Sequence, residues 1–332
     1  MESNREYRKK EGGPLFLCIA SILEILKREG VEVTVQGSHE MIVDHICSIE
    51  NADRNSLAYY VGKDLDSLSH LQESVLICLP DIIPRNLNVT RLETNEPQLA
   101  FYILAQYFGP SPEGPSIHPT AVIHREAIVH PTASIGAYSI LEKCVIGEGA
   151  VVHPNVQIYK NTEIGKGVII EASSCIGATG QMWTWAKDGK KWVLPQLGKT
   201  IIMDHCFVGS NVTIARGALH DTIIGRGCRI SHGSMIGHNC KFGEDTFISN
   251  GVAISGGVTT GKYCFLGTGS RYRSGVILGN NITVGVGAVV VGNFTEDNLV
   301  IAGIPAKIIK KVESGVKLIG VPHKPAFLDV SG

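Results

Sequence analysis

Two histidines occupy equivalent positions in a repetitive stretch of this sequence, and their type and spacing suggest base chemistry. His232 and His238 each hold the third position of a six-residue block, within Ile230-Ser-His-Gly-Ser-Met-Ile-Gly-His. Imidazole titrates near neutrality, so a histidine that projects into a groove can act as a general base. Gly256 lies eighteen residues after His238. A glycine there would let a ligand approach a backbone N–H that could stabilise an oxyanion. A base with an oxyanion donor is the minimum constellation for acyl transfer.

The element that must position these residues is a six-residue repeat. From about residue 117 to residue 290, an apolar residue, often followed by glycine, heads nearly every block. A period of six fits neither an amphipathic helix nor an alternating strand. It is typical of a solenoid of short parallel strands, with the aliphatic residue inside and the glycine at a turn that needs unusual backbone angles. Three blocks make one triangular coil, so residues eighteen apart stack about one strand spacing, ~4.8 Å, from each other. This rule predicts that Gly256 lies beside His238.

The repeat also divides the chain into parts. Residues 1–14 are polar and charged, without a small-residue cleavage site, and are expected to form a flexible N-terminus. Residues 15–110 lack the period and are predicted to form a mixed α/β domain. A linker rich in Gly and Pro precedes the solenoid of residues 116–300, and residues 301–332 are expected to be a C-terminal tail. Residues 178–200 interrupt the repeat, and such an excursion often lies on the binding face.

Composition excludes several classes of function. The chain has 332 residues, with 30 Lys and Arg against 31 Asp and Glu, so nucleic acid is not expected to be a partner. No apolar run approaches the roughly 18 to 20 residues of a membrane span. The nine cysteines form no Cys-x-x-Cys pair, and those in the solenoid are expected to be buried thiols rather than metal ligands or disulfides. A cytoplasmic location is therefore expected. Four of these cysteines share the fifth position of a block, namely Cys206, Cys228, Cys240 and Cys264.

Several longer motifs carry a family resemblance. They are Asn55-Ser-Leu-Ala-Tyr-Tyr, Asn95-Glu-Pro-Gln-Leu-Ala-Phe, Pro195-Gln-Leu-Gly, Val208-Gly-Ser-Asn, Arg216-Gly-Ala-Leu-His-Asp-Thr and His238-Asn. With the tryptophan-containing insertion, their order and spacing resemble the UDP-3-O-acylglucosamine N-acyltransferases of lipid A (lipopolysaccharide) synthesis, over nearly the whole chain after residue 14. The resemblance implies a uridine-binding-like α/β domain on a left-handed parallel β-helix, assembled as a homotrimer with active sites between subunits. It also implies that His238 is the catalytic base and Gly256 the oxyanion donor.

Differences from that family leave the identities of the acyl donor and the acyl acceptor undetermined. Ser231-His232 stands where the family has Asp-Asn, and Ser274-Gly275 where it often has a second histidine. Gly62-Lys-Asp-Leu replaces the family's Asn-Pro-Lys-Tyr in the uridine-binding loop, and the family's C-terminal helix is not evident. The end of the chain, from Val284 to Lys307, is instead similar to the coenzyme A-dependent N-acetyltransferases of nucleotide-linked 3- or 4-amino sugars.

The sequence therefore predicts an N-acyltransferase that transfers an acyl group from a pantetheine thioester to the amine of a nucleotide-linked amino sugar. Acyl-coenzyme A or an acyl carrier protein would be the donor, and no metal is needed because a thioester is already activated. The candidate substrate contacts are Tyr59 or Tyr60, stacked on the base, with His232, Asn239 and Trp192; those for the acyl donor are Gly257 and Lys307.

Three alternatives keep the same fold. The first is an acetyl-coenzyme A-dependent N-acetyltransferase of a 3- or 4-amino-deoxy nucleotide sugar. The second is a zinc-dependent hydratase like the γ-type carbonic anhydrases, which needs three converging histidines where only His232 and His238 are suitable. The third is a non-catalytic assembly subunit, for which His238→Ala would alter nothing except stability.

Overall fold

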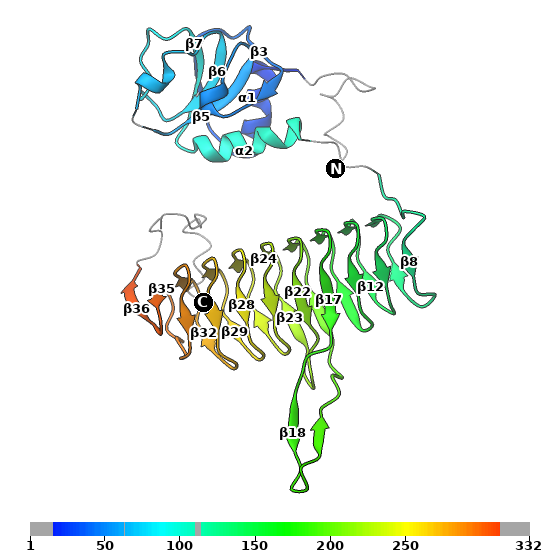
Figure 1. Cartoon of the computed structure of the whole chain (residues 1–332). Coiled ribbons are helices and arrows are strands. Elements are labelled where there is room, and N and C mark those ends of the chain that lie inside the picture. The colour runs from blue at the N-terminus through cyan, green and yellow to red at the C-terminus, as the bar shows by residue number, and fades with distance from the viewer. Residues whose placement is uncertain (1–15, 63, 110–113, 313–332) are drawn as a thin grey trace. The chain divides into compact units, whose positions relative to one another are not determined.

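The chain forms two compact units, one within residues 1–112 and one within residues 113–332. The computed structural model describes residues 16–62, 64–109 and 114–312. The expected flexible N-terminus and the last part of the expected C-terminal tail lie outside these described residues. The two units are drawn in Figure 1, where the colour follows the chain from blue to red.

The first unit is a small α/β domain. Its five-stranded sheet has the order β2-β7-β6-β5-β4, in which β4 to β7 run parallel and β2 pairs antiparallel with β7. The apolar faces of α1 and α2 are buried with residues of the sheet in one core cluster. The strand β7 includes Arg91, which is buried although arginine is rarely found in a core. The elements are β1 (Leu17–Cys18), α1 (Ile19–Arg28), β2 (Thr34–Gln36), β3 (Ile42–Val43), β4 (His45–Ile46), η2 (Ile49–Asn51), β5 (Ser56–Tyr60), η3 (Asp66–Leu68), β6 (Ser74–Cys78), β7 (Val89–Glu93) and α2 (Pro97–Phe108).

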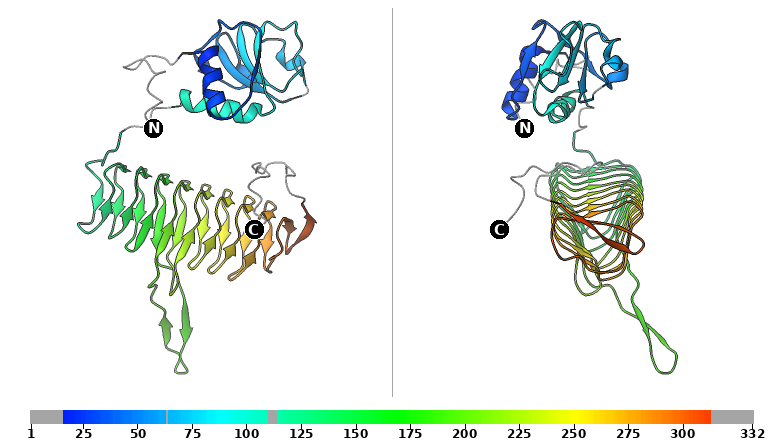
Figure 2. Two further views of the ribbon diagram at one scale, coloured as in Figure 1. Left: turned by 180° about the vertical axis from the view of Figure 1, so that it is seen from behind. Right: turned by 90° about the vertical axis from the view of Figure 1, so that its left-hand side faces the viewer.

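The second unit is a parallel β-helix with three sheets as its walls, seen end-on in the right-hand view of Figure 2. The nine-stranded sheet consists of β8 (Val122–Ile123), β11 (Ile140–Leu141), β14 (Gln157–Ile158), β17 (Cys175–Ala178), β22 (Thr213–Ala215), β25 (Met235–Ile236), β28 (Ala253–Ile254), β31 (Arg271–Tyr272) and β34 (Val289–Val290). The eight-stranded sheet consists of β9 (Ile128–Val129), β12 (Val145–Ile146), β15 (Thr162–Ile164), β20 (Thr200–Ile202), β23 (Thr222–Ile224), β26 (Lys241–Phe242), β29 (Thr259–Thr260) and β32 (Ile277–Leu278). The expected fold class, a left-handed parallel β-helix with a small N-terminal α/β domain, is confirmed.

The ten-stranded sheet closes the triangle and also ends it. It consists of β10 (Ser134–Ile135), β13 (Val151–Val152), β16 (Ile169–Ile170), β21 (Phe207–Val208), β24 (Arg229–Ile230), β27 (Phe247–Ile248), β30 (Phe265–Leu266), β33 (Thr283–Val284), β35 (Leu299–Gly303) and β36 (Ala306–Lys311). The C-terminal tail expected at residues 301–332 begins with ordered strands, since β35 ends at Gly303 and β36 spans Ala306–Lys311. β36 turns back and pairs antiparallel with β35. That pairing covers the edge of β35, which would otherwise present unpaired backbone groups.

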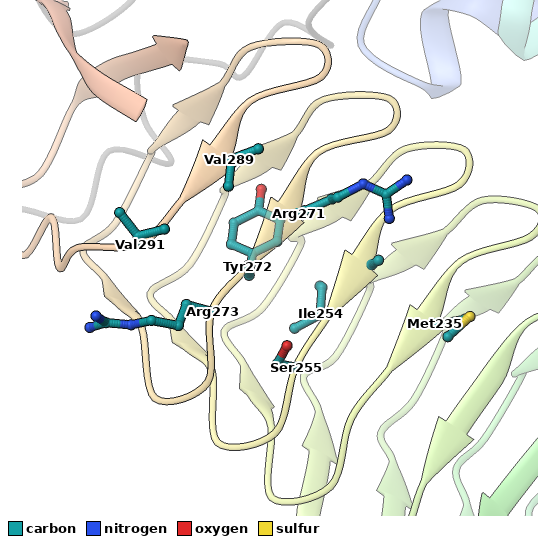
Figure 3. A pocket seen from close by; sticks show the side chains of 9 residues that line it. Met235, Ile254, Ser255, Arg271, Tyr272, Arg273, Val289 and Val291 are labelled. Carbon is teal, nitrogen blue, oxygen red and sulfur yellow. The ribbon is translucent and has the colours of Figure 1, made fainter. Parts of the chain in front are cut away.

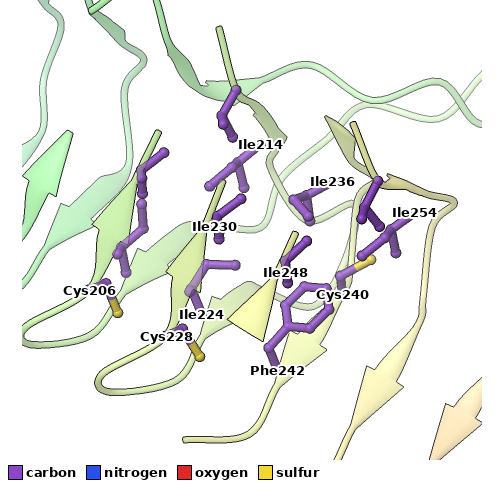
Figure 4. Packing of buried hydrophobic residues seen from close by; sticks show 14 of the residues in the cluster. Cys206, Ile214, Ile224, Cys228, Ile230, Ile236, Cys240, Phe242, Ile248 and Ile254 are labelled. Carbon is purple, nitrogen blue, oxygen red and sulfur yellow. The ribbon is translucent and has the colours of Figure 1, made fainter. Parts of the chain in front are cut away.

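The core of the solenoid is a column of mostly aliphatic side chains, one from the head of each block, in which Phe242, Thr260 and Tyr272 are exceptions. Ile214, Ile230 and Ile248 are essentially fully buried, and Figure 4 shows such residues packed between the walls. Burying each such side chain contributes about 1.5 to 3 kcal/mol relative to leaving it in water. The four cysteines at the fifth position are buried as expected. Burial raises the pKa of the Cys206 thiol to about 12, so this thiol stays protonated at neutral pH.

Glycine recurs at the second position of the blocks for a different reason from the one expected. A Cβ on Gly237 would lie 2.6 Å from the backbone nitrogen of Gly256 on the next coil, and φ is not positive there. Gly237 therefore allows close contact between coils rather than an unusual turn, whereas Gly177, at the start of the insertion, does have a positive φ of 84°. The left-handed backbone falls instead on the fourth position, for example at Asn211 (φ 57°) and Asn239 (φ 61°). Asparagine tolerates that region better than most residues.

The excursion of residues 178–200 is a β-hairpin. Its strands, β18 (Trp183–Trp185) and β19 (Lys191–Val193), pair antiparallel, and Figures 1 and 2 show them projecting away from the solenoid wall. The solenoid resumes at β20, which pairs with β15 in the register that the repeat would have kept without the insertion. In the described part of the chain, no helix is both long and apolar enough to span a bilayer.

Candidate active site

His238 lies at a corner of the solenoid, just after β25 of the nine-stranded sheet, and is half-buried. Met235 pairs with Ala253 and Ile236 with Ile254, so the next coil is offset by eighteen residues. This register brings Gly256 to the position beside His238. The predicted adjacency of these two residues is confirmed, because the backbone N–H of Gly257 also donates to the carbonyl oxygen of His238 at 2.8 Å.

The imidazole of His238 occupies a slot between two glycines. A Cβ on Gly256 would lie 2.5 Å from the ring Cε1 and 2.6 Å from Nε2. On the other side, a Cβ on Gly180 would lie 3.0 Å from the Cβ of His238 and 3.1 Å from its Cδ2. Both faces of the slot thus depend on the absence of a side chain. Gly180 belongs to the root of the hairpin, so the insertion forms one wall of the site.

Asn239 fixes which nitrogen of His238 carries the proton. Its side-chain Oδ1 accepts from the backbone N–H of Ala218 at 3.1 Å, and its Nδ2 donates to the carbonyl oxygen of His220 at 2.7 Å. These two bonds fix the orientation of the amide. The Nδ1 of His238 lies 2.8 Å from the same Oδ1, which can only accept, so Nδ1 must be the donor. In the neutral ring this tautomer leaves the lone pair on Nε2, as a general base requires.

A ladder of hydrogen bonds along the solenoid corners is interrupted at this site. On several coils, the third-position backbone N–H donates to a third-position side chain of the next coil. Lys166 donates to Asp204 at 2.8 Å, Ser210 to His232 at 2.8 Å and Lys262 to Asn280 at 2.9 Å. Among the described residues, the N–H groups of His238 and Gly256 donate no such bond. The next residue along this corner after His238 is Gly256, which has no side chain, and the hydroxyl of Ser274 makes no recorded bond to Gly256. These N–H groups are free for an anionic oxygen, which is what an oxyanion site requires.

One further polar group at the site escaped the sequence reasoning. Gln196 is 92 % buried, since its relative exposure is 8 %, and it donates through Nε2 to the carbonyl oxygen of Leu194 at 3.1 Å. Its Oε1 is buried without a hydrogen-bond partner, and lies 3.0 Å from the position of a Cβ on Gly180. The motif Pro195-Gln-Leu-Gly contributes to the family resemblance, but the insertion has no period, so no spacing rule relates Gln196 to His238.

His232 and Trp192 lie apart from this slot within one chain. His232 follows β24 on the ten-stranded sheet and is exposed, and its Nδ1 accepts the backbone N–H of Ser210. Its ring stands edge-on to Phe207 at 6.4 Å between centroids. Trp192 is on β19, opposite Thr184, and is 56 % exposed. No described contact joins either residue to His238.

A groove of about 460 Å³ follows the outer face of the nine-stranded sheet on the C-terminal side of His238. Arg271 and Arg273 lie at its margin and, among the described residues, neither has a carboxylate within ion-pair distance. Most of the remaining wall is apolar. Figure 3 shows the lining residues, which are Met235, Ala253, Ile254, Ser255, Arg271, Tyr272, Arg273, Val289 and Val291. Lys307 is exposed on β36 opposite Ala302 and is not part of this lining.

The N-terminal unit has a cavity of its own, of about 580 Å³, at the carboxyl ends of β4 and β5. Tyr59 lines it and packs against Phe101, with ring centroids 4.8 Å apart. Tyr60 also lines it, but this side chain is buried and its hydroxyl donates to the carbonyl oxygen of Asp64 at 2.6 Å. Of the two tyrosines, Tyr59 is the more exposed. Ligands of parallel sheets commonly bind at this edge.

Within the described residues of one chain, no three His, Cys, Asp or Glu side chains converge on a point that could hold a metal ion.

Comparison with known proteins also indicates an acyltransferase. Residues 143–178 match the family model described as bacterial transferase hexapeptide (six repeats). The chain is 28 % identical over 235 residues to a UDP-3-O-acylglucosamine N-acyltransferase of Coxiella burnetii, covering 64 % of this chain and 68 % of that protein. An enzyme of the same name from Pseudomonas syringae is 28 % identical over 237 residues, covering 65 % and 67 %.

A solved structure extends the comparison to the fold. The UDP-N-acetylglucosamine O-acyltransferase of Moraxella catarrhalis superposes with a TM-score of 0.53 and 27 % identity, covering 58 % of this chain and 73 % of that one. The resemblance expected from the motifs is confirmed. The protein is an acyltransferase built on hexapeptide repeats.

Proposed function

We propose that this acyltransferase transfers an acyl group from a pantetheine thioester to the amine of a nucleotide-linked amino sugar. The observation that carries the proposal is the state of His238. Its Nδ1 proton is held by Asn239, the neutral ring has its lone pair on Nε2, and the N–H of Gly256 next to it has no acceptor among the described residues. The similarity to UDP-3-O-acylglucosamine N-acyltransferases supports an acylated UDP-glucosamine as acceptor. The family resemblance of the motifs supports a role for this reaction in lipid A synthesis.

The reaction follows from the positions of these groups. The amine nitrogen attacks the thioester carbonyl carbon while Nε2 of His238 takes a proton from the amine, and a carbon–nitrogen bond forms. The carbonyl oxygen becomes an oxyanion that accepts from the N–H of Gly256, an interaction worth about 3 kcal/mol at comparable sites. The carbon–sulfur bond then breaks, and the leaving thiolate takes the proton from Nε2. Asn239 holds the ring in the correct tautomer throughout and is a positioning residue.

The two cavities suit the two ends of the substrates. The apolar groove beside His238 fits the acyl chain of the donor, with Met235, Ile254 and Val289 as its walls. This lining favours a long acyl group over an acetyl group, because apolar area buried by the chain stabilises binding. Tyr59 in the cavity of the N-terminal unit is the candidate for stacking on the nucleotide base. We further propose that the enzyme is a cytoplasmic homotrimer, in keeping with the family resemblance.

The test is an acyl-transfer assay with purified protein. UDP- and dTDP-linked amino sugars are offered as acceptors, with a 3-hydroxyacyl carrier protein and acetyl-coenzyme A as donors, and thiol release is followed. We expect turnover with His238 intact and a loss of about a hundredfold to ten-thousandfold in His238→Ala, the range for losing a general base. Equal rates for the variant and the wild-type protein would refute the mechanism. Turnover with acetyl-coenzyme A alone would favour the sugar N-acetyltransferase alternative.

A further inference from the structure

One short loop is bonded to both legs of the hairpin. It consists of residues 216–221, between β22 and β23, and is here called the clamp loop. On the entry leg, the backbone N–H of Arg216 donates to the carbonyl oxygen of Ala178 at 2.8 Å. On the exit leg, the carbonyl oxygen of Ala218 accepts from the N–H of Leu197 at 2.7 Å. A displacement of the hairpin root therefore acts directly on this loop.

Two charged side chains fasten the ends of the clamp loop. At the C-terminal end, the Oδ1 of Asp221 accepts the backbone N–H of Lys199 at 2.7 Å. The carbonyl oxygen of Lys199 in turn accepts from the N–H of Gly217 at 3.1 Å. At the N-terminal end, Arg216 is buried and its Nη2 donates to the carbonyl oxygen of Lys160, which follows β14 two coils earlier. Hydrogen bonds to charged groups are stronger than those between neutral groups, so these two side chains hold the loop in one position.

The clamp loop also sets the orientation of the Asn239 amide. The N–H of Ala218 donates to its Oδ1 at 3.1 Å, and the carbonyl oxygen of His220 accepts from its Nδ2 at 2.7 Å. A reversed amide would place donor against donor and acceptor against acceptor at both contacts. It would also turn Nδ2 toward the Nδ1 of His238, so that Nδ1 would accept and the proton would lie on Nε2. The orientation of one amide thus decides whether the imidazole can act as a base.

We propose that the clamp loop couples the hairpin to the tautomer of His238, and that Asp221 is a positioning residue for the base. Ala218 carries the coupling, because its carbonyl oxygen is bonded to the hairpin and its N–H is bonded to Asn239. Asp221 acts through the loop rather than by contact with the imidazole. The inference rests on the proposed function, since the tautomer affects the rate only where His238 is the base.

The test removes the carboxylate of Asp221 and reads the position of the proton separately from the rate. The main variant is Asp221→Ala. Asp221→Asn is its conservative counterpart, because the amide oxygen can still accept from Lys199. The matched control is Asp204→Ala, because the Oδ1 of Asp204 makes the same kind of bond, to the backbone N–H of Lys166 at 2.8 Å, at the corner after β20.

Each protein is measured in two ways. Thiol release gives kcat, its pH profile and the KM for the nucleotide-linked amino sugar. NMR of the imidazole nitrogens shows which nitrogen of His238 carries the proton, with the signals assigned by comparison with His238→Gln. The melting temperature of each variant reports how much the lost bond contributes to the fold alone.

For Asp221→Ala, we expect kcat to fall about tenfold, less than for loss of the base itself, with a changed pH profile and KM within twofold of wild type. NMR should show the proton of the wild-type His238 on Nδ1, and a mixture of the two tautomers in the variant. Asp221→Asn should restore the rate and the tautomer. Asp204→Ala should lower the melting temperature by a similar amount and leave both at their wild-type values.

A proton that stays on Nδ1 of His238 in Asp221→Ala would overturn the inference, even with a lower kcat, because the loss would then be structural. The same change of tautomer in Asp204→Ala would overturn it as well. Should Asp221→Ala not fold, Arg216→Met decides, since it removes the bond to Lys160 at the other end of the clamp loop. A mixture of tautomers in that variant would support the coupling, and an unchanged tautomer would refute it. A change of tautomer in a protein that turns over no donor would support the coupling and instead sink the proposed function.

Discussion

Gly256→Ala is the substitution that bears most directly on the slot around His238. The new Cβ would lie 2.5 Å from Cε1 and 2.6 Å from Nε2 of the imidazole, whereas carbon atoms in contact are at about 3.5 Å or more. The ring must therefore move by roughly 1 Å. A misplacement of this size costs about a hundredfold in rate, so kcat should fall by about that factor.

The folded state should tolerate the same change. The φ angle of Gly256 is not positive, so alanine fits the backbone, and the residue is half-buried at a corner. Replacing glycine by alanine at a compatible position stabilises by about 0.4 to 1 kcal/mol through the unfolded chain, which offsets part of the strain. We expect the free energy of unfolding, measured by urea denaturation, to change by less than about 1 kcal/mol. The loss of rate would then be a local effect.

The chain offers a matched control at the same corner. Gly292 is the third-position residue two coils further on, and a Cβ there would meet nothing within 4 Å. Gly292→Ala should therefore keep the wild-type kcat in the thiol-release assay. The double variant Gly256→Ala with His238→Ala should be no slower than His238→Ala alone, because both act on one group. If Gly256→Ala keeps kcat within twofold of wild type, the assignment of the slot is wrong.

Three further outcomes are expected. Asn239→Ala should lower kcat about tenfold to a hundredfold and change its pH profile while leaving KM nearly unchanged, because the proton on Nδ1 of His238 loses its fixed acceptor; an unchanged profile would contradict this. Hydrogen bonding to Asp44 raises the pKa of His45 in the folded protein. The protonated His45 therefore stabilises the fold fully below about pH 6.5, its pKa in the unfolded chain, and this stabilisation is lost as the pH rises through the pKa in the folded protein. His45→Gln should therefore destabilise the N-terminal unit, by at most about 1 kcal/mol for so exposed a pair, at pH 5.5 but not at pH 9, as measured by hydrogen exchange. A hydrogen bond to Ser21 lowers the pKa of the exposed Cys18 thiol, so iodoacetamide should label Cys18 before the buried solenoid cysteines, as read by mass spectrometry.

The repeat made part of the site predictable. Because the walls advance by one coil every eighteen residues, the sequence alone placed Gly256 beside His238, and the register of β25 with β28 agrees. It also predicted the buried cysteines and the excursion from the wall. The reason for glycine at the second position was not predictable from the sequence, because the contact between backbones on adjacent coils depends on the shape of the whole corner.

The rest of the site depends on segments without a period. Gly180 reaches His238 because the hairpin folds back at its root, and no spacing rule relates residue 180 to residue 238. The orientation of the Asn239 amide is set by Ala218 and His220, in a loop between β22 and β23. The strand β36 was missed because it lies beyond the repeat and runs antiparallel to its neighbour.

The number of coils on the N-terminal side of the solenoid is independent of the residues that form the slot around His238. Each coil pairs only with the coils directly before and after it, as β11 pairs only with β8 and β14. The slot draws on the hairpin root and on the coils that carry β22, β25 and β28, so the coils before β14 have no part in it. Whole coils in that stretch can be gained or lost through changes of about eighteen residues, each of which moves the first coil by one strand spacing of ~4.8 Å along the axis. The length of the solenoid on the N-terminal side of the site can therefore vary while the residues around His238 stay unchanged.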